Sequence, residues 1–471
     1  METALIKIAQ VIVAFAILII LHEGGHFLAA KMFKIRVEKF YLFFDAWNVK
    51  LFSTYWPWFR KMIGKEPVKK DEKGREEYVG TEYGIGWLPL GGYVKIAGMI
   101  DESMDKEQMK QPPQPWEFRT KPAWQRLIVM LGGIIVNFIT AFIIYIGVLF
   151  AWGESFVKPT DITYGMKFNE EAKADGFCDG DQFVSVDGKE VKAWSVNVLR
   201  DIANAKEVSV LRNGKKVSIS IPEGKNMLSM AQSNPPYADI LIPFSIDSVL
   251  AGTPAEAIGL KPGDIISEVN GKTVNDYNEF VYMLTSLSEP LTENSTAADS
   301  LRLRTVTFLV NQTDTLKAVL TSEFKIGIMP NIPEYKVTNK EYGFLESIPE
   351  GLAYGWNKLT SYVSDLKYLF TADGAKSMSG IVGITNIFPE QWDWQRFWLL
   401  TALLSIALGV MNVLPIPALD GGHAVFAIYE IITRRKPSDK VLERAQYVGF
   451  AIILALMVFA TWNDIMRIIG M

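Results

Sequence analysis

Four long apolar stretches divide the chain. They cover about Ile6–Phe33, Trp124–Trp152, Trp398–Val413 and Val448–Ile469. A helix needs roughly 20 mostly apolar residues to cross a bilayer, so we expect a polytopic α-helical membrane protein with four transmembrane helices. The third stretch is the shortest and is followed by prolines, but the aromatic cluster at its start is typical of a membrane interface.

Basic residues near the ends of these stretches predict their orientation. The first is followed by Lys31, Lys34, Arg36 and Lys39, and the second is preceded or opened by Arg119, Lys121 and Arg126. The loop between the third and fourth contains Arg434, Arg435, Lys436, Lys440 and Arg444. Cytoplasmic loops are enriched in such residues. Both loops should therefore be cytoplasmic, and both termini and the segment from about Gly153 to Glu390 should lie outside.

An internal repeat occupies this external segment. Gly176, Gly180-Asp181 and Asp187-Gly188 recur at one constant spacing as Gly259, Gly263-Asp264 and Asn270-Gly271. Asp-Gly and Asn-Gly between apolar runs indicate tight hairpins. We expect two small β-rich domains of similar fold, at residues 157–235 and 240–330, between membrane parts at residues 1–152 and 390–471.

A connector at residues 344–378 follows the repeat. Its apolar residues recur every three or four positions from Ile348 to Leu369, which predicts an amphipathic helix. Such a helix can lie on the membrane surface or pack against the β-rich domains, and the periodicity fits both.

The loop between the first two spans contains a short apolar segment, Tyr83–Met99. Two strand-like pieces flank Leu90-Gly91-Gly92. We expect a membrane-associated β-hairpin that enters the membrane against protein. The alternative is a soluble hairpin on the cytoplasmic surface. The charged insertion from about Arg60 to Glu77 suggests no function.

Composition adds little to this picture. Hydrophobic residues make up 49% of the 471, and the formal net charge is −4, which gives no sign of nucleic-acid binding. Cys178 is the only cysteine, so an intramolecular disulfide is excluded.

The sequence His22-Glu23-Gly24-Gly25-His26 carries the strongest chemical signal. Residues four apart share one face of a helix, so both imidazoles can reach one metal ion. Glu23 stands beside them as a general base. This is the arrangement of zinc proteases, and ionisable groups inside an apolar span are usually functional. The structural alternative is a pair of buried histidines whose ring N–H groups donate to backbone carbonyls.

A catalytic zinc takes three protein ligands, and Asp420 is the candidate for the third. It follows the proline-broken third span, where coordination would offset the cost of a buried carboxylate. Alternatively, it caps the next helix. Asn412 and Asn137 can each hydrogen-bond to substrate or join helices. Asn137 and His423 are also candidates for supporting roles around the ligands, and His423 for packing.

These motifs together resemble the site-2 protease family, in its RseP-type branch, over nearly the whole chain. The motif at His22–His26, the segment Asn412–Asp420, Leu90–Val94 and Gly132-Gly133 through Asn137-Phe138 all match. The repeat around Gly259-Leu260 closely resembles a PDZ domain. Gly132-Gly133 stands where Gly-Pro is commoner in the family.

The resemblance implies an enzyme of the bacterial inner membrane with periplasmic PDZ domains. Zn²⁺ would be bound by His22, His26 and Asp420, with Glu23 as the base. Leu90, Gly91, Gly92, Tyr93 and Val94 would pair with an unwound transmembrane substrate. Family substrates include anti-sigma factors, first cut by an upstream site-1 type protease, and remnant signal peptides.

Two other interpretations stay open. A tethered protease for soluble substrates fits poorly with the apolar surroundings of His22 and Asp420. A non-catalytic PDZ scaffold fits poorly with the presence of both Glu23 and Asp420. The PDZ domains themselves can either bind extended peptide at a sheet edge or only restrict access.

Overall fold

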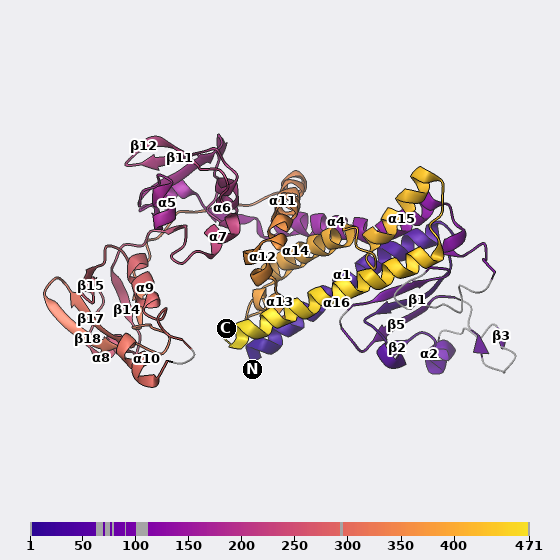
Figure 1. Cartoon of the computed structure of the whole chain (residues 1–471), viewed down its shortest axis with the longest axis horizontal. Coiled ribbons are helices and arrows are strands. Elements are labelled where there is room, and N and C mark those ends of the chain that lie inside the picture. Colours follow the sequence, from indigo (N-terminus) through magenta and orange to yellow (C-terminus); the bar gives the residue numbers. More distant parts are fainter. Residues whose placement is uncertain are drawn as a thin grey trace. The chain divides into compact units, whose positions relative to one another are not determined.

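The computed structural model describes residues 2–62, 69–70, 76–77, 80–89, 91–99, 112–292 and 295–469. The chain forms two compact units (Figure 1). We call them the membrane unit, Met1–Gly153 with Glu341–Met471, and the β-rich unit, Glu154–Lys340.

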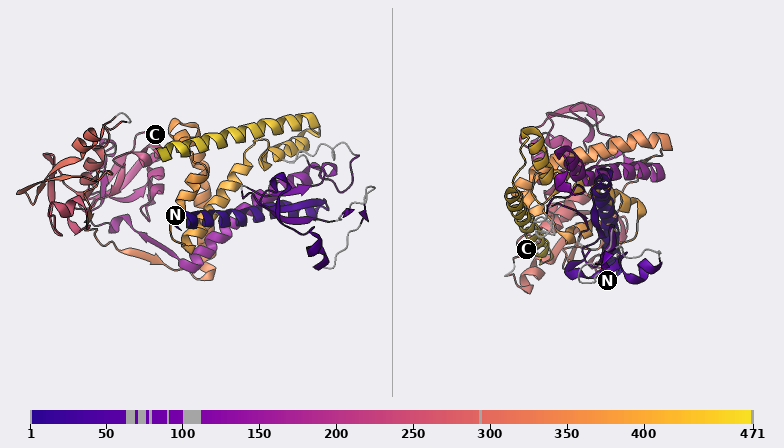
Figure 2. Two further views of the ribbon diagram at one scale, coloured as in Figure 1. Left: turned by 90° about the horizontal axis from the view of Figure 1, so that it is seen from below. Right: turned by 90° about the vertical axis from the view of Figure 1, so that its right-hand side faces the viewer.

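The membrane unit contains four helices long and apolar enough to cross a bilayer. They are α1 (Glu2–Met32), α4 (Ala123–Trp152), α14 (Trp394–Val413) and α16 (Asp439–Ile469). The prediction of a four-helix membrane protein is therefore confirmed. The start of α1 and the end of α16 lie at the same end of this unit (Figures 1 and 2), as an even number of crossings requires.

Helix α4 is the centre of the membrane unit. Helices α1, α14, α11 (Phe344–Asp365) and α15 (Asp420–Thr433) all pack against it. Shorter helical segments lie at residues 46–48, 57–62, 118–120, 366–370, 372–377 and 381–387. Close approach of α1 and α4 depends on glycine, because a Cβ on Gly25 would stand 2.6 Å from the Gly132 carbonyl carbon. Small residues at such crossings are typical of membrane helices.

Helix α11 makes a contact that neither alternative for the connector included. Its buried face is small, with Ser347, Gly351 and Gly355 recurring every four residues. A Cβ on Gly351 would stand 2.6 Å from Ile146 of α4, and one on Gly355 would stand 2.6 Å from Phe142. The amphipathic helix is therefore held on a transmembrane helix by backbone-close packing.

The loop after α1 forms a four-stranded mixed sheet in the order β2-β5-β1-β6. The strands are β1 (Val37–Leu42), β2 (Lys50–Ser53), β5 (Glu82–Gly86) and β6 (Tyr93–Ile96). The predicted hairpin is wrong, because β1 lies between β5 and β6. A tight hairpin needs only about two loop residues. The connection over residues 87–92 is longer, which is enough for the chain to cross β1 between β5 and β6.

A buried carboxylate joins three strands of this sheet. Glu82 of β5 accepts hydrogen bonds from the Tyr41 hydroxyl (2.7 Å), the Lys50 ammonium (2.7 Å) and the Ser53 hydroxyl (2.6 Å). Of the predicted charged insertion, only its start and the paired strands β3 (Lys69–Lys70) and β4 (Glu76–Glu77) belong to the described residues.

The β-rich unit contains two domains with the same strand order. The first has sheets β10-β9-β11-β12 and β13-β8, and the second has β16-β15-β17-β18 and β14-β19. Their strands are β8 (Met166–Phe168), β9 (Gln182–Val186), β10 (Lys189–Glu190), β11 (Glu207–Arg212), β12 (Lys215–Ser220), β13 (Ala238–Ile240), β14 (Ile246–Val249), β15 (Ile266–Val269), β16 (Lys272–Thr273), β17 (Thr305–Val310), β18 (Asp314–Val319) and β19 (Ile328–Pro330). The repeat therefore encodes two similar β-rich folds, as predicted.

The turns of the repeat have the predicted geometry. Asp187-Gly188 and Asn270-Gly271 all have positive φ, between 46° and 77°, which suits the two-residue hairpins β9–β10 and β15–β16. Helices of this unit are α5 (Glu170–Ala174), α6 (Val196–Ala203), α7 (Met227–Gln232), α8 (Pro254–Ala257), α9 (Tyr277–Ser286) and α10 (Ala297–Arg304), with a short turn at Pro159–Asp161. Strands β7 (Glu154–Val157) and β20 (Val337–Lys340) pair where the chain enters and leaves the unit.

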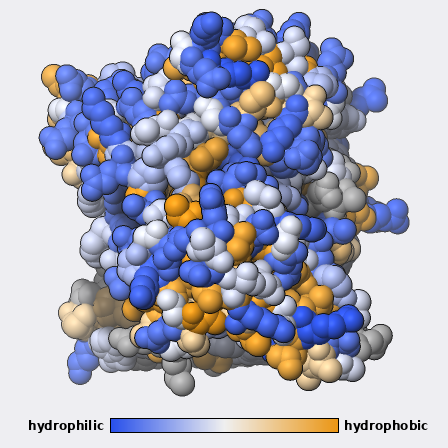
Figure 3. Space-filling model, turned by 90° about the vertical axis from the view of Figure 1, so that its left-hand side faces the viewer, coloured by the Kyte–Doolittle hydropathy of each residue, from blue (hydrophilic) through white to orange (hydrophobic). Residues whose placement is uncertain are grey.

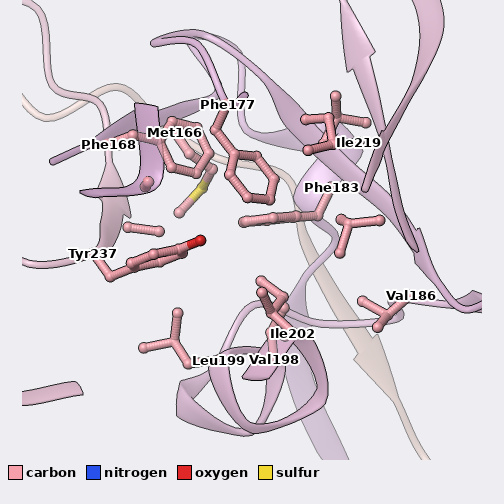
Figure 4. Close-up of a cluster of buried hydrophobic side chains, with 14 of the residues drawn as sticks. Met166, Phe168, Phe177, Phe183, Val186, Val198, Leu199, Ile202, Ile219 and Tyr237 are labelled. Carbon is pink, nitrogen blue, oxygen red and sulfur yellow. The ribbon is translucent and has the colours of Figure 1, made fainter. Parts of the chain in front are cut away.

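Each domain has its own hydrophobic core. In the first, Phe168, Phe177, Phe183 and Tyr237 are fully buried and pack ring against ring (Figure 4). The second is built around Phe280 and other buried residues of a separate cluster. Hydrophilic groups dominate the molecular face in Figure 3, with smaller hydrophobic patches among them.

Candidate active site

The two histidines of the motif lie on unbroken helix. Helix α1 continues through Gly24 and Gly25 to Met32, so His22 and His26 stand about one turn apart on one face. Both are buried, with 8% and 6% of their surfaces exposed. Glu23 is half-buried between them in sequence. The local helix therefore presents two imidazoles together inside an apolar span.

Asp420 completes a triangle with these histidines. Its Oδ2 atom lies 3.3 Å from the Nε2 atom of His22 and 3.3 Å from that of His26. The two Nε2 atoms are also 3.3 Å apart. Asp420 comes from the first turn of α15, almost four hundred residues along the chain, so tertiary packing brings the group together.

This triangle fits one tetrahedral zinc ion. With zinc–ligand bonds of about 2.0–2.1 Å, two ligands of a tetrahedral ion lie about 3.3 Å from each other. The donor set of two imidazoles and one carboxylate is of the kind that catalytic zinc uses, with a fourth position open. The Oδ2 atom of Asp420 is buried and has no hydrogen-bond partner among the described residues, as expected for a metal ligand.

Helix α4 orients both imidazoles. The Nδ1–H of His26 donates to the Val129 carbonyl at 2.8 Å, which leaves its Nε2 free for a metal. Nδ1 of His22 lies 3.0 Å from the Asn137 carboxamide, whose Oδ1 atom is buried without a partner. A half-turn of that amide exchanges its O and N atoms, so Asn137 can accept from His22 Nδ1–H. Such partners fix the tautomer of a ligand.

The remaining polar candidates lie at different places. The Asn412 amide is 3.5 Å from His22 Nε2 and is buried, so it reaches the site. His423 follows Asp420 on α15 but is not one of the three clustered ligands. Just before Asp420, Ala418 has φ of 82°, a strained conformation that often marks functional sites.

A glycine on α4 makes room for the two imidazoles. A Cβ on Gly133 would lie 2.6 Å from His22 Cε1 and would also collide with His26 Nε2. Sequence reasoning did not assign this residue or Val129 a role at the site. The glycine pair was visible in the sequence, but a backbone carbonyl such as that of Val129 leaves no sequence signal.

The predicted substrate-binding segment forms the end of the small sheet. Tyr93 and Val94 belong to β6, the outermost strand, which pairs only with β1 among the described residues. Gly92 lies against α1, since a Cβ there would stand 2.5 Å from Ile19 Cγ2. Gly91 has φ of 154°, and Leu90 lies outside the described residues. The start of β6 is therefore about one helical turn from His22 along α1.

A metalloprotease motif on a membrane-spanning helix, completed by a carboxylate from a distant helix, defines the class as a membrane-embedded metalloprotease. The model of Peptidase family M50 matches residues 10–59 and 73–456. The chain belongs to this family, the site-2 proteases.

Similar curated proteins agree over almost the whole chain. The "Regulator of sigma E protease" of Haemophilus influenzae is 27% identical, with 98% of this chain and 99% of that protein covered. "Protease RseP" of Yersinia pestis is 28% identical, with 99% and 100% covered. A "Putative zinc metalloprotease" of Vibrio cholerae is 28% identical, with 97% and 98% covered. The protein is therefore a zinc metalloprotease of the RseP type, and the predictions of family, enzyme class and zinc are confirmed.

Proposed function

We propose that this enzyme hydrolyses peptide bonds within transmembrane segments of single-pass membrane proteins. The observation that carries the proposal is the 3.3 Å triangle of His22, His26 and Asp420, built on a helix that can cross the bilayer. A zinc site at that depth serves a substrate that is itself in the membrane. Charged ligands there are costly and need a functional reason.

Each residue then has a defined task. His22, His26 and Asp420 would hold zinc, which supplies Lewis acidity to a water molecule and to the scissile carbonyl. Glu23 takes a proton from that water and delivers it to the leaving nitrogen. Val129 and Asn137 keep the Nε2 atoms of the histidines directed at the metal. Asn412, whose amide lies 3.5 Å from His22 Nε2, would donate to the substrate backbone beside the zinc.

We further propose that β6 binds the substrate as an added strand. A transmembrane helix hides its carbonyls in its own hydrogen bonds, so the segment must unwind before cleavage. An edge strand offers unpaired backbone groups, and pairing with Tyr93–Ile96 would hold the substrate extended. Since Gly92 packs on Ile19, an added strand would pass close to the zinc ligands.

The membrane setting follows from the charge pattern. We place both termini and the β-rich unit on the periplasmic side of a bacterial inner membrane, because the basic loops favour the cytoplasm. Ile19 is thirteen residues before the end of α1, or roughly 20 Å at 1.5 Å per residue. The contact with Gly92 therefore supports a sheet that enters the membrane from the cytoplasmic side.

Substrates of the anti-sigma-factor type, and remnant signal peptides, fit this proposal. Relatives named for regulation of sigma E support the first class. We assign the two β-rich domains to the PDZ fold, on the repeat around Gly259-Leu260, and propose that they act as a size gate. A substrate with a bulky ectodomain would collide with them, so an upstream protease must trim it first.

Two substitutions test the chemistry. Glu23→Gln should keep zinc but lose at least ~10²-fold in turnover, because the ligands remain while the base is gone. Asp420→Asn should weaken zinc itself, since a neutral amide is a poorer ligand. Metal content after dialysis against chelator and cleavage of a membrane-spanning peptide measure both. Near-normal turnover by the Glu23→Gln enzyme would refute the assignment.

The gate is tested by removing the β-rich domains and comparing one substrate, intact and trimmed. The deletion should permit cleavage of the intact substrate and leave the rate on the trimmed one similar. If the domains instead recruit the new carboxyl terminus of a trimmed substrate, the deletion should slow that substrate and leave the intact one uncut.

A further inference from the structure

The outer edge of strand β13 in the first β-rich domain is already bonded within the chain. Leu241 N–H donates to the Gly165 carbonyl, and Asn169 N–H donates to the Tyr237 carbonyl, so odd-numbered residues of this strand face β8. Even-numbered residues therefore direct their backbone groups to the other side. That side is where an extended peptide would add.

Helix α9 of the second domain occupies this edge. The Asn278 carboxamide donates to the Ile240 carbonyl at 3.0 Å and accepts from Ile242 N–H at 2.8 Å. Tyr277 N–H donates to the Ile242 carbonyl at 2.9 Å. One side-chain amide thus supplies the donor and acceptor that a pairing strand would supply. Asn278 is only 5% exposed.

Two further contacts secure the same helix. The Tyr282 hydroxyl donates to Asp239 Oδ2 at 3.1 Å. Lys167 of β8 binds Asp179 of its own domain at 2.8 Å and Asp276 of the second domain at 2.7 Å. Asp276 also caps α9 through the Glu279 N–H. A buried lysine between two carboxylates joins the domains, and such charges are costly to separate.

The corresponding edge of the second domain is open only at Ile328, because the Ile326 carbonyl on the same side accepts from Ala255 N–H and Pro330 has no N–H. Leu250 N–H and Asn331 N–H pair across β14 and β19 with Gly327 and Ser245 carbonyls, so the backbone of Ile328 faces outward. Among the residues that the structure describes, no segment outside the β14–β19 pair bonds to this outward-facing backbone of Ile328. Neighbouring Met329 and Ile332 are 46% and 56% exposed.

We propose that helix α9 is the resident ligand of the first PDZ-like domain, closing its strand edge, and that only the β19 edge of the pair is available to an extended peptide. The inference deepens the PDZ assignment above. It is independent of the zinc chemistry, so its failure would leave the protease proposal intact. It also fixes the angle between the two domains, which a size gate requires.

Hydrogen exchange at single-residue resolution on the full chain tests the edge. Asn278→Leu should speed exchange of the Ile242 amide roughly 5-fold, the scale of one lost hydrogen bond. The neighbouring Leu241 amide, bonded to the Gly165 carbonyl, should not change. Asn275→Leu is the matched control, because the Asn275 side chain donates to Glu279 of its own domain and not to the first domain. Equal Ile242 exchange in the parent and the Asn278→Leu protein would overturn the proposal.

A distance measurement covers the case in which Asn278→Leu unfolds α9. Spin labels at exposed Lys216 and Lys317, in a Cys178→Ser background, report the separation of the domains in the full chain. The parent should give one narrow distance, and Lys167→Met should broaden it. Lys173→Met is the control, since this lysine touches Asp179 at 3.3 Å without crossing between domains. A distribution that stays narrow in Lys167→Met would count against the resident-ligand contact.

Discussion

Gly133→Ala should strongly weaken metal binding without replacing any of the proposed ligands. Gly133 lies on α4, where its Cα faces the two imidazoles of α1. A Cβ there would stand 2.6 Å from His22 Cε1 and 2.7 Å from His22 Nδ1. The substitution adds one methyl group on α4, directly against the two imidazoles of α1.

The size of the effect follows from these distances. Non-bonded carbon atoms rest about 3.5–4.0 Å apart, so the His22 ring must move by about 1 Å. Zinc sites tolerate deviations of about 0.2 Å in ligand distance. Disturbing the groups that orient a ligand commonly weakens metal binding 10–100-fold. We expect a loss at the upper end of this range or beyond, because the collision involves both histidines.

Zinc content after dialysis against graded concentrations of chelator measures the loss. Gly147→Ala is the matched control, because Gly147 lies on the same helix and a Cβ there would meet nothing within 4 Å. Both substitutions replace glycine by a better helix former, so helix propensity cannot account for a difference between them. If both variants retain zinc like the parent, the close approach of α4 to the ligands is not as described.

Other substitutions probe separate parts of the molecule. Gly25→Ala should weaken zinc binding and thermal stability, whereas Gly24→Ala should do neither, because only Gly25 contacts α4; equal melting temperatures would contradict this. Burial raises the pKa of the Asp179 carboxyl, but its hydrogen bond with Lys167 outweighs burial, so the pKa is lowered overall. Its stabilisation is present above the unfolded pKa of about 3.9 and is lost as pH falls through the folded value. The difference in melting temperature between the parent and the Asp179→Asn protein should therefore shrink from pH 6 to pH 3. With Cys178 replaced, Ser438→Cys should be shielded from an impermeant thiol reagent in intact cells and Asn275→Cys should react; the reverse would overturn the orientation.

Local periodicity accounts for the parts of the fold that the sequence predicted. The spans and the pairing of His22 with His26 depend only on helix geometry over a few turns. The proposed third ligand, Asp420, was identifiable on different grounds. A zinc site needs one more ligand, and an aspartate that follows a proline-broken span is costly to bury unless it binds a metal.

The strand order was not predictable in the same way. Residues 82–86 and 93–96 are close in sequence, which favoured a hairpin between them. In the structure each of these strands pairs with β1 instead. Its alternation places Tyr41 over Glu82 and beside Tyr93, so two buried hydrogen-bonding groups are satisfied at once. Buried carboxylates must find partners, and that requirement acts between segments forty residues apart.

Two pairs of glycines, one on α1 and one on α4, lie beside the candidate metal site. Gly24-Gly25 and Gly132-Gly133 are both visible as small residues in apolar spans, yet their roles differ. Gly25 and Gly132 lie against each other's backbone, Gly133 lies against the two imidazoles, and a Cβ on Gly24 would meet nothing within 4 Å. A polar cluster at this depth must be shielded from lipid and satisfied by protein. Wide helix spacing would leave His26 out of reach of the Val129 carbonyl. Because Gly25 and Gly132 allow α1 and α4 to approach closely, the Val129 carbonyl of α4 can accept a hydrogen bond from His26 and orient its ring. Side chains alone would not hold the imidazole in this way.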